Sequence, residues 1–231
     1  MEIQLVKERT VYALGTFSQS WVCCFKEFFP LFGAWFVSTF MPVVFLVITV
    51  ALGLGLDMGV IGKEGPGWWT LLGLVIPGVL IGCFYAGWIY VALKVARGIP
   101  VKPTDIFRPL NQALNSLFAV CIIVSAVSIG LMFFVLPGAM LFLRLQLAPF
   151  FIVDQNMGAI EAIKRSWEET RRMFVPLALL DLMFYGLGLV TTSVIFGPFL
   201  CNMGLTVATA LVYAKWLTDE NHPDMPKIEA E

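Results

Sequence analysis

The sequence predicts an all-α, polytopic membrane protein with six transmembrane helices arranged as three hairpins. Of its 231 residues, 59% are hydrophobic and only 13% are charged, and the mean hydropathy is +0.85. A soluble domain has about 25% charged residues, so too few polar side chains remain here to cover a surface in water. Apolar runs of about 20 residues, the length of a spanning helix, recur along the chain. We therefore expect lipid to be its main outer solvent.

Six apolar runs are candidate spans: 31–56, 68–93, 113–136, 137–153, 175–196 and 198–217. Only Pro137-Gly138 separates the third run from the fourth, and only Gly197-Pro198 separates the fifth from the sixth. Both dipeptides are turn signals, and proline disfavours helix in the residue before it. Each pair is therefore interpreted as a tight hairpin, with one long kinked helix as the alternative.

The basic residues predict how these spans cross the membrane. If all six spans exist, 13 of the 15 Lys and Arg residues fall on one side, Lys63 falls on the other, and Arg144 lies inside a span. Cytoplasmic loops carry an excess of Lys and Arg, so both termini are expected in the cytoplasm. The loss of one span would break this alternation.

One membrane domain, 1–231, is expected. Its parts are a cytoplasmic or interfacial lead segment (1–30), the first hairpin (31–93), a cytoplasmic loop (94–112), the second hairpin (113–153), an amphipathic helix (154–174), the third hairpin (175–217) and a cytoplasmic tail (218–231).

The amphipathic helix is predicted from the pattern of residues 157–174. Its charged residues fall on one face, and the opposite face carries Ile160, Ile163, Trp167 and Phe174. Asp154 or Asn156 is expected to cap its start. The pattern is typical of a helix that lies in the membrane interface with its apolar face toward the acyl chains. A cytosolic helix docked on the bundle is the alternative.

Part of this pattern recurs near the N-terminus. The motif S-W-x6-F-x-P-L occurs at 20–31 and again at 166–177, and a fainter match occurs at 107–110. Each match precedes a predicted hairpin. The recurrence predicts parallel repeats of a lead segment plus two spans, with an amphipathic interfacial helix also before the first hairpin.

Small residues spaced four apart predict close contacts between helices. They are Gly78, Gly82 and Ala86 in the second span, and Gly204 and Ala208 in the sixth. Packing inside the bundle is the favoured interpretation, and self-association is the alternative.

A polar patch inside the membrane is predicted around Arg144. A charge at the centre of a span costs on the order of 2.5–3.5 kcal/mol to insert, so Arg144 needs a partner. Asp181 in the fifth span is the expected counter-charge, and Gln146 and Asn202 are expected to join the same patch. A structural tie of Arg144 to Asp181 or to a carbonyl is favoured. A ligand or lipid site around Arg144, and snorkelling to the interface, are the alternatives.

No motif predicts catalysis or a cofactor. The sequence lacks H-E-x-x-H, G-x-S-x-G, P-loop and dinucleotide-binding patterns. One histidine, and five cysteines without a C-x-x-C pair, argue against a transition-metal site. Asp57 and Glu64 in the short outer loop are most simply solvated, with a cation site there as a weaker alternative. We expect a protein that is not an enzyme and holds no cofactor.

The stretch 136–177 resembles a known family. It contains Pro137-Gly138 at the start of a span, Arg144 within it, Ala148-Pro149 near its end, Asp154, and a helix reading A-I-K-R-S-W. These features resemble the YciC-like integral membrane proteins and the membrane domain of some bacterial glycerophosphoryl diester phosphodiesterases. The resemblance implies a six-helix module in the cytoplasmic (inner) membrane of a bacterium or archaeon, without assigned catalytic residues. The phosphodiesterase catalytic domain is absent here, so that activity is not carried over.

The expected function is that of a non-enzymatic integral membrane module: an accessory, scaffold or lipid-interacting subunit of a larger assembly. Its expected partners are the lipid bilayer and either other membrane subunits or a second copy of the chain, and no nucleic acid. The alternative is a carrier that moves a lipid or small amphiphile through a central crevice, which the repeat and Arg144 favour. A membrane enzyme acting on lipids is a third hypothesis, but no acid–base pair supports it.

Overall fold

The computed structural model describes residues 2–56, 67–193 and 197–217, and every regular element in these ranges is helical, which confirms the predicted all-α class. The elements are α1 (Glu2–Lys26), α2 (Phe28–Leu56), α3 (Trp68–Ala96), the 3-10 segment η2 (Pro103–Gln112), α4 (Ala113–Phe133), α5 (Val135–Leu145), α6 (Ala148–Gln155), α7 (Ala159–Val190), the 3-10 turn η3 (Thr191–Ser193) and α8 (Gly197–Leu217). Within the described residues, five segments are long and apolar enough to cross a membrane.

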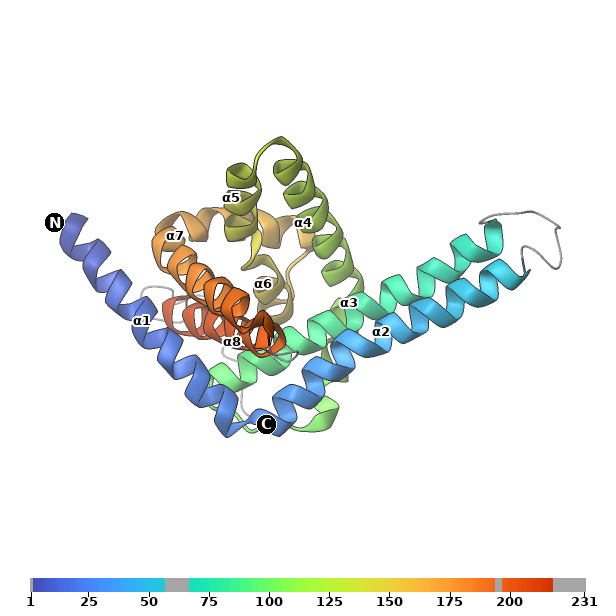
Figure 1. Ribbon diagram of the computed structural model, residues 1–231, viewed down its shortest axis with the longest axis horizontal. Coiled ribbons are helices and arrows are strands. Elements are labelled where there is room, and N and C mark those ends of the chain that lie inside the picture. The colour runs from blue at the N-terminus through green and yellow to red at the C-terminus, as the bar shows by residue number, and fades with distance from the viewer. Residues whose placement is uncertain (1, 57–66, 194–196, 218–231) are drawn as a thin grey trace.

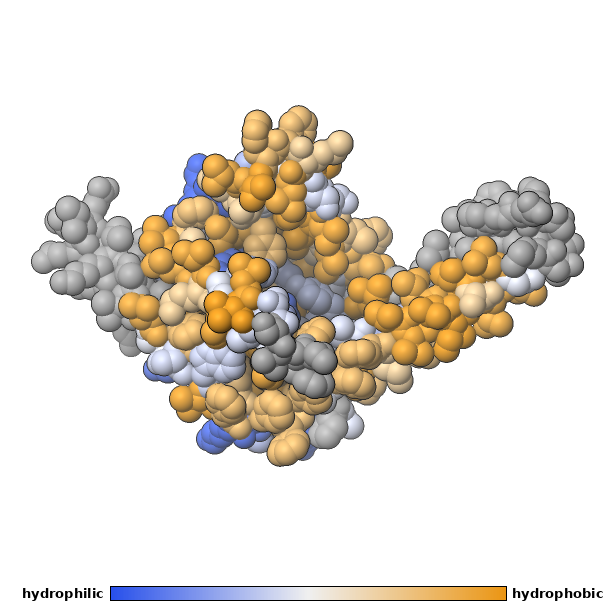
Figure 2. Space-filling model, in the orientation of Figure 1, coloured by the Kyte–Doolittle hydropathy of each residue, from blue (hydrophilic) through white to orange (hydrophobic). Residues whose placement is uncertain are grey.

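Helices α4 to α8 form a body, and α2 and α3 extend from it side by side as an arm, with α1 along the other side of the body (Figure 1). Most of α2 is apolar and exposed: Phe40, Val47 and Leu52 show 44, 63 and 62% of their surface. Orange, apolar residues cover the arm and much of the body (Figure 2). Such a surface is expected to contact lipid rather than water.

The turn between α4 and α5 lies at Phe134, three residues before the predicted turn at Pro137-Gly138. Phe134 is extended (φ −161, ψ 153). Pro137 lies in the first turn of α5, where its missing N–H is not needed. A Cβ on Gly130 would lie 2.9 Å from the Cα of Gly138, so these two glycines bring the helices into close contact beside the turn.

The predicted fourth span, 137–153, is not one helix. It is interrupted at Gln146 and Leu147, between α5 and α6. Pro149 has no N–H to donate to the carbonyl of Leu145, and its ring crowds that carbonyl. The next N–H groups, of Phe150 and Phe151, donate instead to the carbonyl of Leu147, at 3.1 and 3.3 Å. The proline therefore separates α6 from α5 and leaves Gln146 in the turn.

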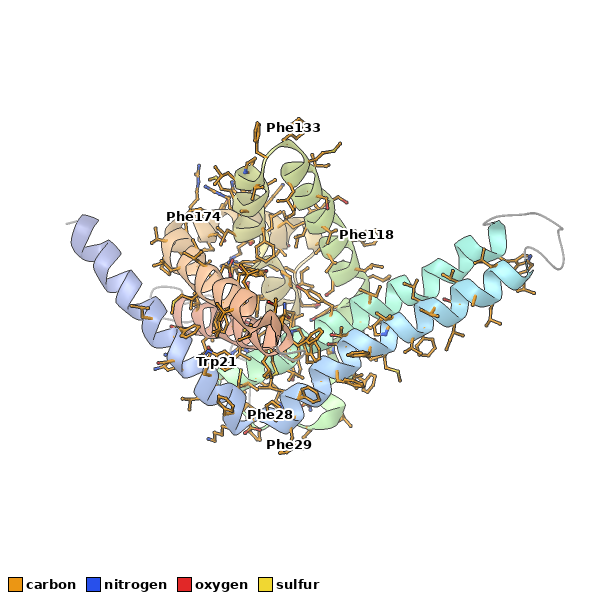
Figure 3. All side chains as sticks on the ribbon, viewed as in Figure 1. Trp21, Phe28, Phe29, Phe118, Phe133 and Phe174 are labelled. Carbon is orange, nitrogen blue, oxygen red and sulfur yellow. The ribbon has the colours of Figure 1, made fainter. Side chains whose placement is uncertain are left out.

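The predicted amphipathic helix and the predicted fifth span are one continuous helix, α7, which includes Pro176 and ends at Val190 rather than at residue 196. The helix bends along its length in Figure 1, and Phe174 lies beside the bend in Figure 3. Pro176 leaves one carbonyl unbonded and permits the bend without ending the helix. The separate boundary predicted at residue 174 was wrong.

The predicted cap of this helix was also wrong. Asp154 belongs to the last turn of α6, and Asn156 ends α6 in the left-handed conformation (φ 52). Gly158 precedes α7 and provides no side-chain cap. Asn tolerates the left-handed conformation better than most residues, so it is suited to ending a helix.

One face of α7 is buried from Ala159 to Phe184, although the helix continues to Val190. Its members recur at three- and four-residue spacing, as a helical stripe requires: Ala159, Ala162, Ser166, Thr170, Met173, Leu177, Leu180 and Phe184. The predicted apolar face is a different one. Ile160 and Trp167 are 66 and 40% exposed, while Ile163 and Phe174 are half-buried. The outward position of Ile160 and Trp167 agrees with contact to acyl chains.

Helix α1 packs on α7 and α8 through aromatic side chains. The ring centroids of Phe17 and Trp21 lie 4.8 and 5.9 Å from that of Phe184. Lys215 donates to the side-chain oxygen of Gln19 at 2.6 Å. Trp21 points from α1 toward the body in Figure 3. The lead segment is therefore a helix docked on the bundle.

Candidate functional site

Arg144 lies in the last turn of α5 and joins α5 to α7. Its guanidinium carbon is 4.5 Å from the centre of the Trp167 ring, a cation–π contact. Its backbone carbonyl accepts hydrogen bonds from the hydroxyls of Ser166 at 2.7 Å and Thr170 at 3.3 Å. One guanidinium nitrogen, Nη1, is buried without a hydrogen-bond partner in the described structure.

The expected ion pair between Arg144 and Asp181 is not formed. Asp181 is buried on α7, and neither of its carboxylate oxygens has a hydrogen-bond partner among the described residues. Arg144 contacts α7 at Trp167, and Asp181 lies 14 residues farther along the same helix, about 21 Å at the helical rise per residue. The sequence could not reveal this separation because it depends on where α5 crosses α7.

Gln146 and Asn202, in contrast, are brought together. Both line a cavity of about 370 Å³ to which α2 to α8 all contribute. A second cavity, of about 600 Å³, shares Trp35, Thr39, Tyr185, Asn202 and Leu205 with the first. We call the two joined cavities the crevice. A hollow between the arm and the body, with paler and blue residues beneath an orange rim, is visible in Figure 2.

The crevice is lined by aromatic, aliphatic and uncharged polar side chains. Its hydroxyl and amide side chains are Ser38, Thr39, Tyr85, Gln146, Tyr185, Thr192, Asn202, Thr206 and Thr209. None of the described residues lining it is charged. Of the four residues predicted to form one polar patch, two therefore face this crevice and two lie elsewhere.

Several crevice hydroxyls are already used within their own helices. Ser38 donates to the carbonyl of Trp35 at 2.8 Å. Thr206 donates to the carbonyl of Asn202 at 3.0 Å and accepts from the indole N–H of Trp88 at 3.4 Å. Gln146 differs, because its Nε2 is buried and has no hydrogen-bond partner in the described part of the chain.

The sequence reasoning missed the crevice residues on α2, α3 and α8, although a signal for them exists. Trp35, Ser38 and Thr39 recur at the spacing of one helical face within an otherwise apolar helix. Asn202, Thr206 and Thr209 recur in the same way on α8. A polar stripe in an apolar helix indicates a face turned toward other helices or a cavity.

Of the predicted small residues, Gly82, Ala86, Gly204 and Ala208 lie at contacts between helices. A Cβ on Gly82 would lie 2.6 Å from the carbonyl oxygen of Ala113, and a Cβ on Gly204 would lie 2.6 Å from the ring of Phe184. Ala86 and Ala208 are fully buried. The surroundings of Gly78 lie outside the described structure, as do Asp57 and Glu64. No cluster of three potential metal-ligating side chains occurs among the residues searched, which exclude that loop.

A second cluster of side chains is charged, unlike the lining of the crevice. It joins the ends of several helices. Arg97 donates to the carboxylate of Asp154 at 2.7 Å, and the hydroxyl of Tyr213 donates to the same oxygen at 3.0 Å. Beside it, Lys94 pairs with Asp105 at 2.7 Å. These contacts connect the end of α3 with η2, α6 and α8. They hold the elements around the crevice together.

Comparison with known proteins identifies a family. Residues 66–219 match the model of a domain of unknown function, DUF7847. Among curated proteins and solved structures, none matches this chain. The matched region includes the crevice residues of α3 to α8 and leaves out α1 and α2. The resemblance to YciC-like proteins has no support from these matches and stays a prediction. Because the match covers two thirds of the sequence, the chain belongs to the DUF7847 family.

Proposed function

We propose that this chain is a non-enzymatic integral membrane module that holds a lipid or other amphiphile in the crevice and acts as a lipid-interacting subunit of a membrane assembly. The crevice is the observation that carries this proposal. Its two parts, of about 370 and 600 Å³, have the size of sites for small molecules. Aromatic walls with a few converging polar groups are also typical of such sites.

In this proposal the chain crosses the inner membrane of a bacterium or archaeon six times, and both of its termini lie in the cytoplasm. The contact of Arg97 with Asp154 supports it, because it joins the two loops that the basic residues assign to one side. The exposed apolar surface of α2 supports contact with lipid. The YciC-like resemblance favours the same setting.

The repeat is part of the proposal, and burial supports it for two of the three copies. Ser20 and Ser166, which occupy the same motif position, are both fully buried. Leu31 and Leu177 are likewise both fully buried. The corresponding residue of the faint third copy, Leu110, is 54% exposed. A duplication of lead segment plus hairpin therefore has support for the first and last units.

A carrier is the second candidate function, and the opening of the crevice favours it. Tyr185 lines both cavities and is 51% exposed, and Thr39 and Asn202 are exposed as well. The crevice is thus open to the surroundings of the chain. One of its walls is α2, which belongs to the extended arm. A movement of that arm would change access to the crevice.

Binding can be tested by purifying the protein in nanodiscs and measuring retained lipid by native mass spectrometry. Gln146→Leu and Asn202→Leu are expected to retain less lipid than the wild type. Asn115→Leu is the matched control, because Asn115 is an amide on α4 that does not line the crevice. Equal retention by all four proteins would contradict the proposal. For the carrier function, vesicles containing the protein should move a fluorescent lipid between leaflets faster than protein-free vesicles.

A further inference from the structure

Resting on the proposed function, we infer that the crevice selects amphiphiles with an uncharged, hydrogen-bonding head, and that this head lies in the smaller cavity against Gln146. The inference names the ligand class of the crevice. Three features of the structure carry it: the absence of charge in the lining, the polar groups left unused, and the division of the crevice into two parts.

The lining offers no compensation for a charged head. None of the described lining residues is acidic or basic. Arg144 is two residues from Gln146, but its guanidinium stacks on Trp167. Asp181, one helical turn before Tyr185 on α7, is acidic and supplies no cation to the crevice. A phosphate head would lose its hydration here without gaining a cation, which is strongly unfavourable in an apolar setting.

Neutral hydrogen-bonding groups, in contrast, are present and unused. Gln146 Nε2 is a buried donor without a partner, and a buried donor left unpaired is costly. The side chains of Thr39, Tyr85, Tyr185 and Asn202 also have no hydrogen-bond partner within the described ranges. Hydroxyl, ester or carbonyl oxygens of a ligand head would accept from these groups.

The two parts of the crevice differ in a way that orients an amphiphile. Gln146 and Tyr85 line only the smaller cavity. Only the larger cavity is lined by Phe184, Leu189 and Phe199, which are apolar. The head is therefore placed among the amide and hydroxyl groups of the smaller cavity, and the chain passes Tyr185 into the larger one. The polar head then contacts polar side chains, and the apolar chain contacts apolar side chains.

Two common sources share this ligand chemistry: neutral glycerolipids and isoprenoid quinones. Both combine oxygen acceptors on an uncharged head with long apolar chains. The test uses nanodiscs of phosphatidylcholine doped in separate arms with dioleoylglycerol, with menaquinone, or with phosphatidylglycerol at equal mole fraction. Lipid that stays bound to the released protein is measured by native mass spectrometry, with Asn115→Leu as the control variant.

We expect one or both neutral probes to be retained at least about tenfold over phosphatidylglycerol, which corresponds to about 1.4 kcal/mol. Gln146→Leu should reduce that retention several-fold, and Gln146→Glu should reduce it further by adding a charge. Asn115→Leu should behave as the wild type. Retention of dioleoylglycerol alone, or of menaquinone alone, identifies the source. Equal or better retention of phosphatidylglycerol overturns this inference while the proposed function stands. Equal retention of every probe at the phosphatidylcholine background also overturns this inference, and release of the protein with no bound lipid at all would contradict the proposed function.

Discussion

The contact of Arg97 with Asp154 should dominate the stability of the helix ends around the crevice. The side chains of Arg97 and Asp154 are 17 and 3% exposed, and their atoms are 2.7 Å apart. Replacing Arg97 with Met removes the cation and leaves the carboxylate buried. Breaking a buried pair in this way costs about 3–5 kcal/mol, because the remaining charge is uncompensated.

The double variant separates the interaction energy between Arg97 and Asp154 from the effect of replacing each residue alone. In Arg97→Met/Asp154→Leu no charge stays buried, so the free energy of unfolding should recover to within about 1–2 kcal/mol of the wild type. The residual loss reflects Tyr213, whose hydroxyl no longer donates to Asp154. The coupling energy of the cycle should accordingly reach about 2 kcal/mol or more.

The assay is reversible unfolding of the purified protein in mixed detergent micelles, followed by tryptophan fluorescence. Two results would refute the reasoning. One is an Arg97→Met variant within about 1 kcal/mol of the wild type, a loss that a surface pair would show. The other is additivity of the two single substitutions, because it would mean that the two side chains do not interact.

Three further predictions concern packing, topology and protonation. Gly82→Ala should lower the free energy of unfolding by about 1–3 kcal/mol, because its Cβ would lie 2.6 Å from the Ala113 carbonyl, whereas Gly186→Ala, with nothing within 4 Å of its Cβ, should be neutral in the same assay. Phe134 is 75% exposed at the turn between α4 and α5, which the proposed six-span topology places on the outer side, so Phe134→Cys should react with membrane-impermeant maleimide in intact cells; protection from the reagent would contradict that topology. Burial raises the pKa of the Cys24 thiol from 9.0 to about 12, so its contribution to stability is full below pH 9.0 and is lost as the pH rises toward 12. Alkaline unfolding curves of the wild type and Cys24→Ala should therefore diverge only above pH 9.0, and divergence near neutrality would contradict this.

The predicted positions of the long helices were accurate where hydrophobicity alone determines them. The first predicted span ended at Leu56, as α2 does, and the second began at Trp68, as α3 does. Errors arose at prolines. Pro149 separates α6 from α5, whereas Pro176 only bends α7. Pro137 lies in the first turn of α5, where it interrupts no hydrogen bond of the helix. The effect of a proline depends on which carbonyl its ring faces and on the packing around it, and neither can be derived from the dipeptide.

The candidate site was predicted only in part, for a related reason. Gln146 and Asn202 were expected to join the polar patch around Arg144; both line the crevice instead, as an amide in a span faces other helices or a cavity. Arg144 and Asp181 were grouped with them by charge alone. Their separation follows from the crossing point of α5 on α7, where Trp167 contacts the guanidinium first. The aromatic walls of the crevice, such as Trp35 and Trp88, cannot be distinguished in sequence from lipid-facing aromatic residues.

Composition and periodicity by themselves determined that this chain is helical and that most of its surface suits lipid, because both properties follow from local spacing and total apolar content. The tertiary structure decided which polar residues meet. It places Gln146 at a proline-induced turn, beside residues of α2, α3, α7 and α8 that are distant in sequence. Only the crossing of helices creates that proximity, since no local pattern encodes the direction in which one helix meets another. The crevice, and with it the proposed ligand, is a property of those crossings.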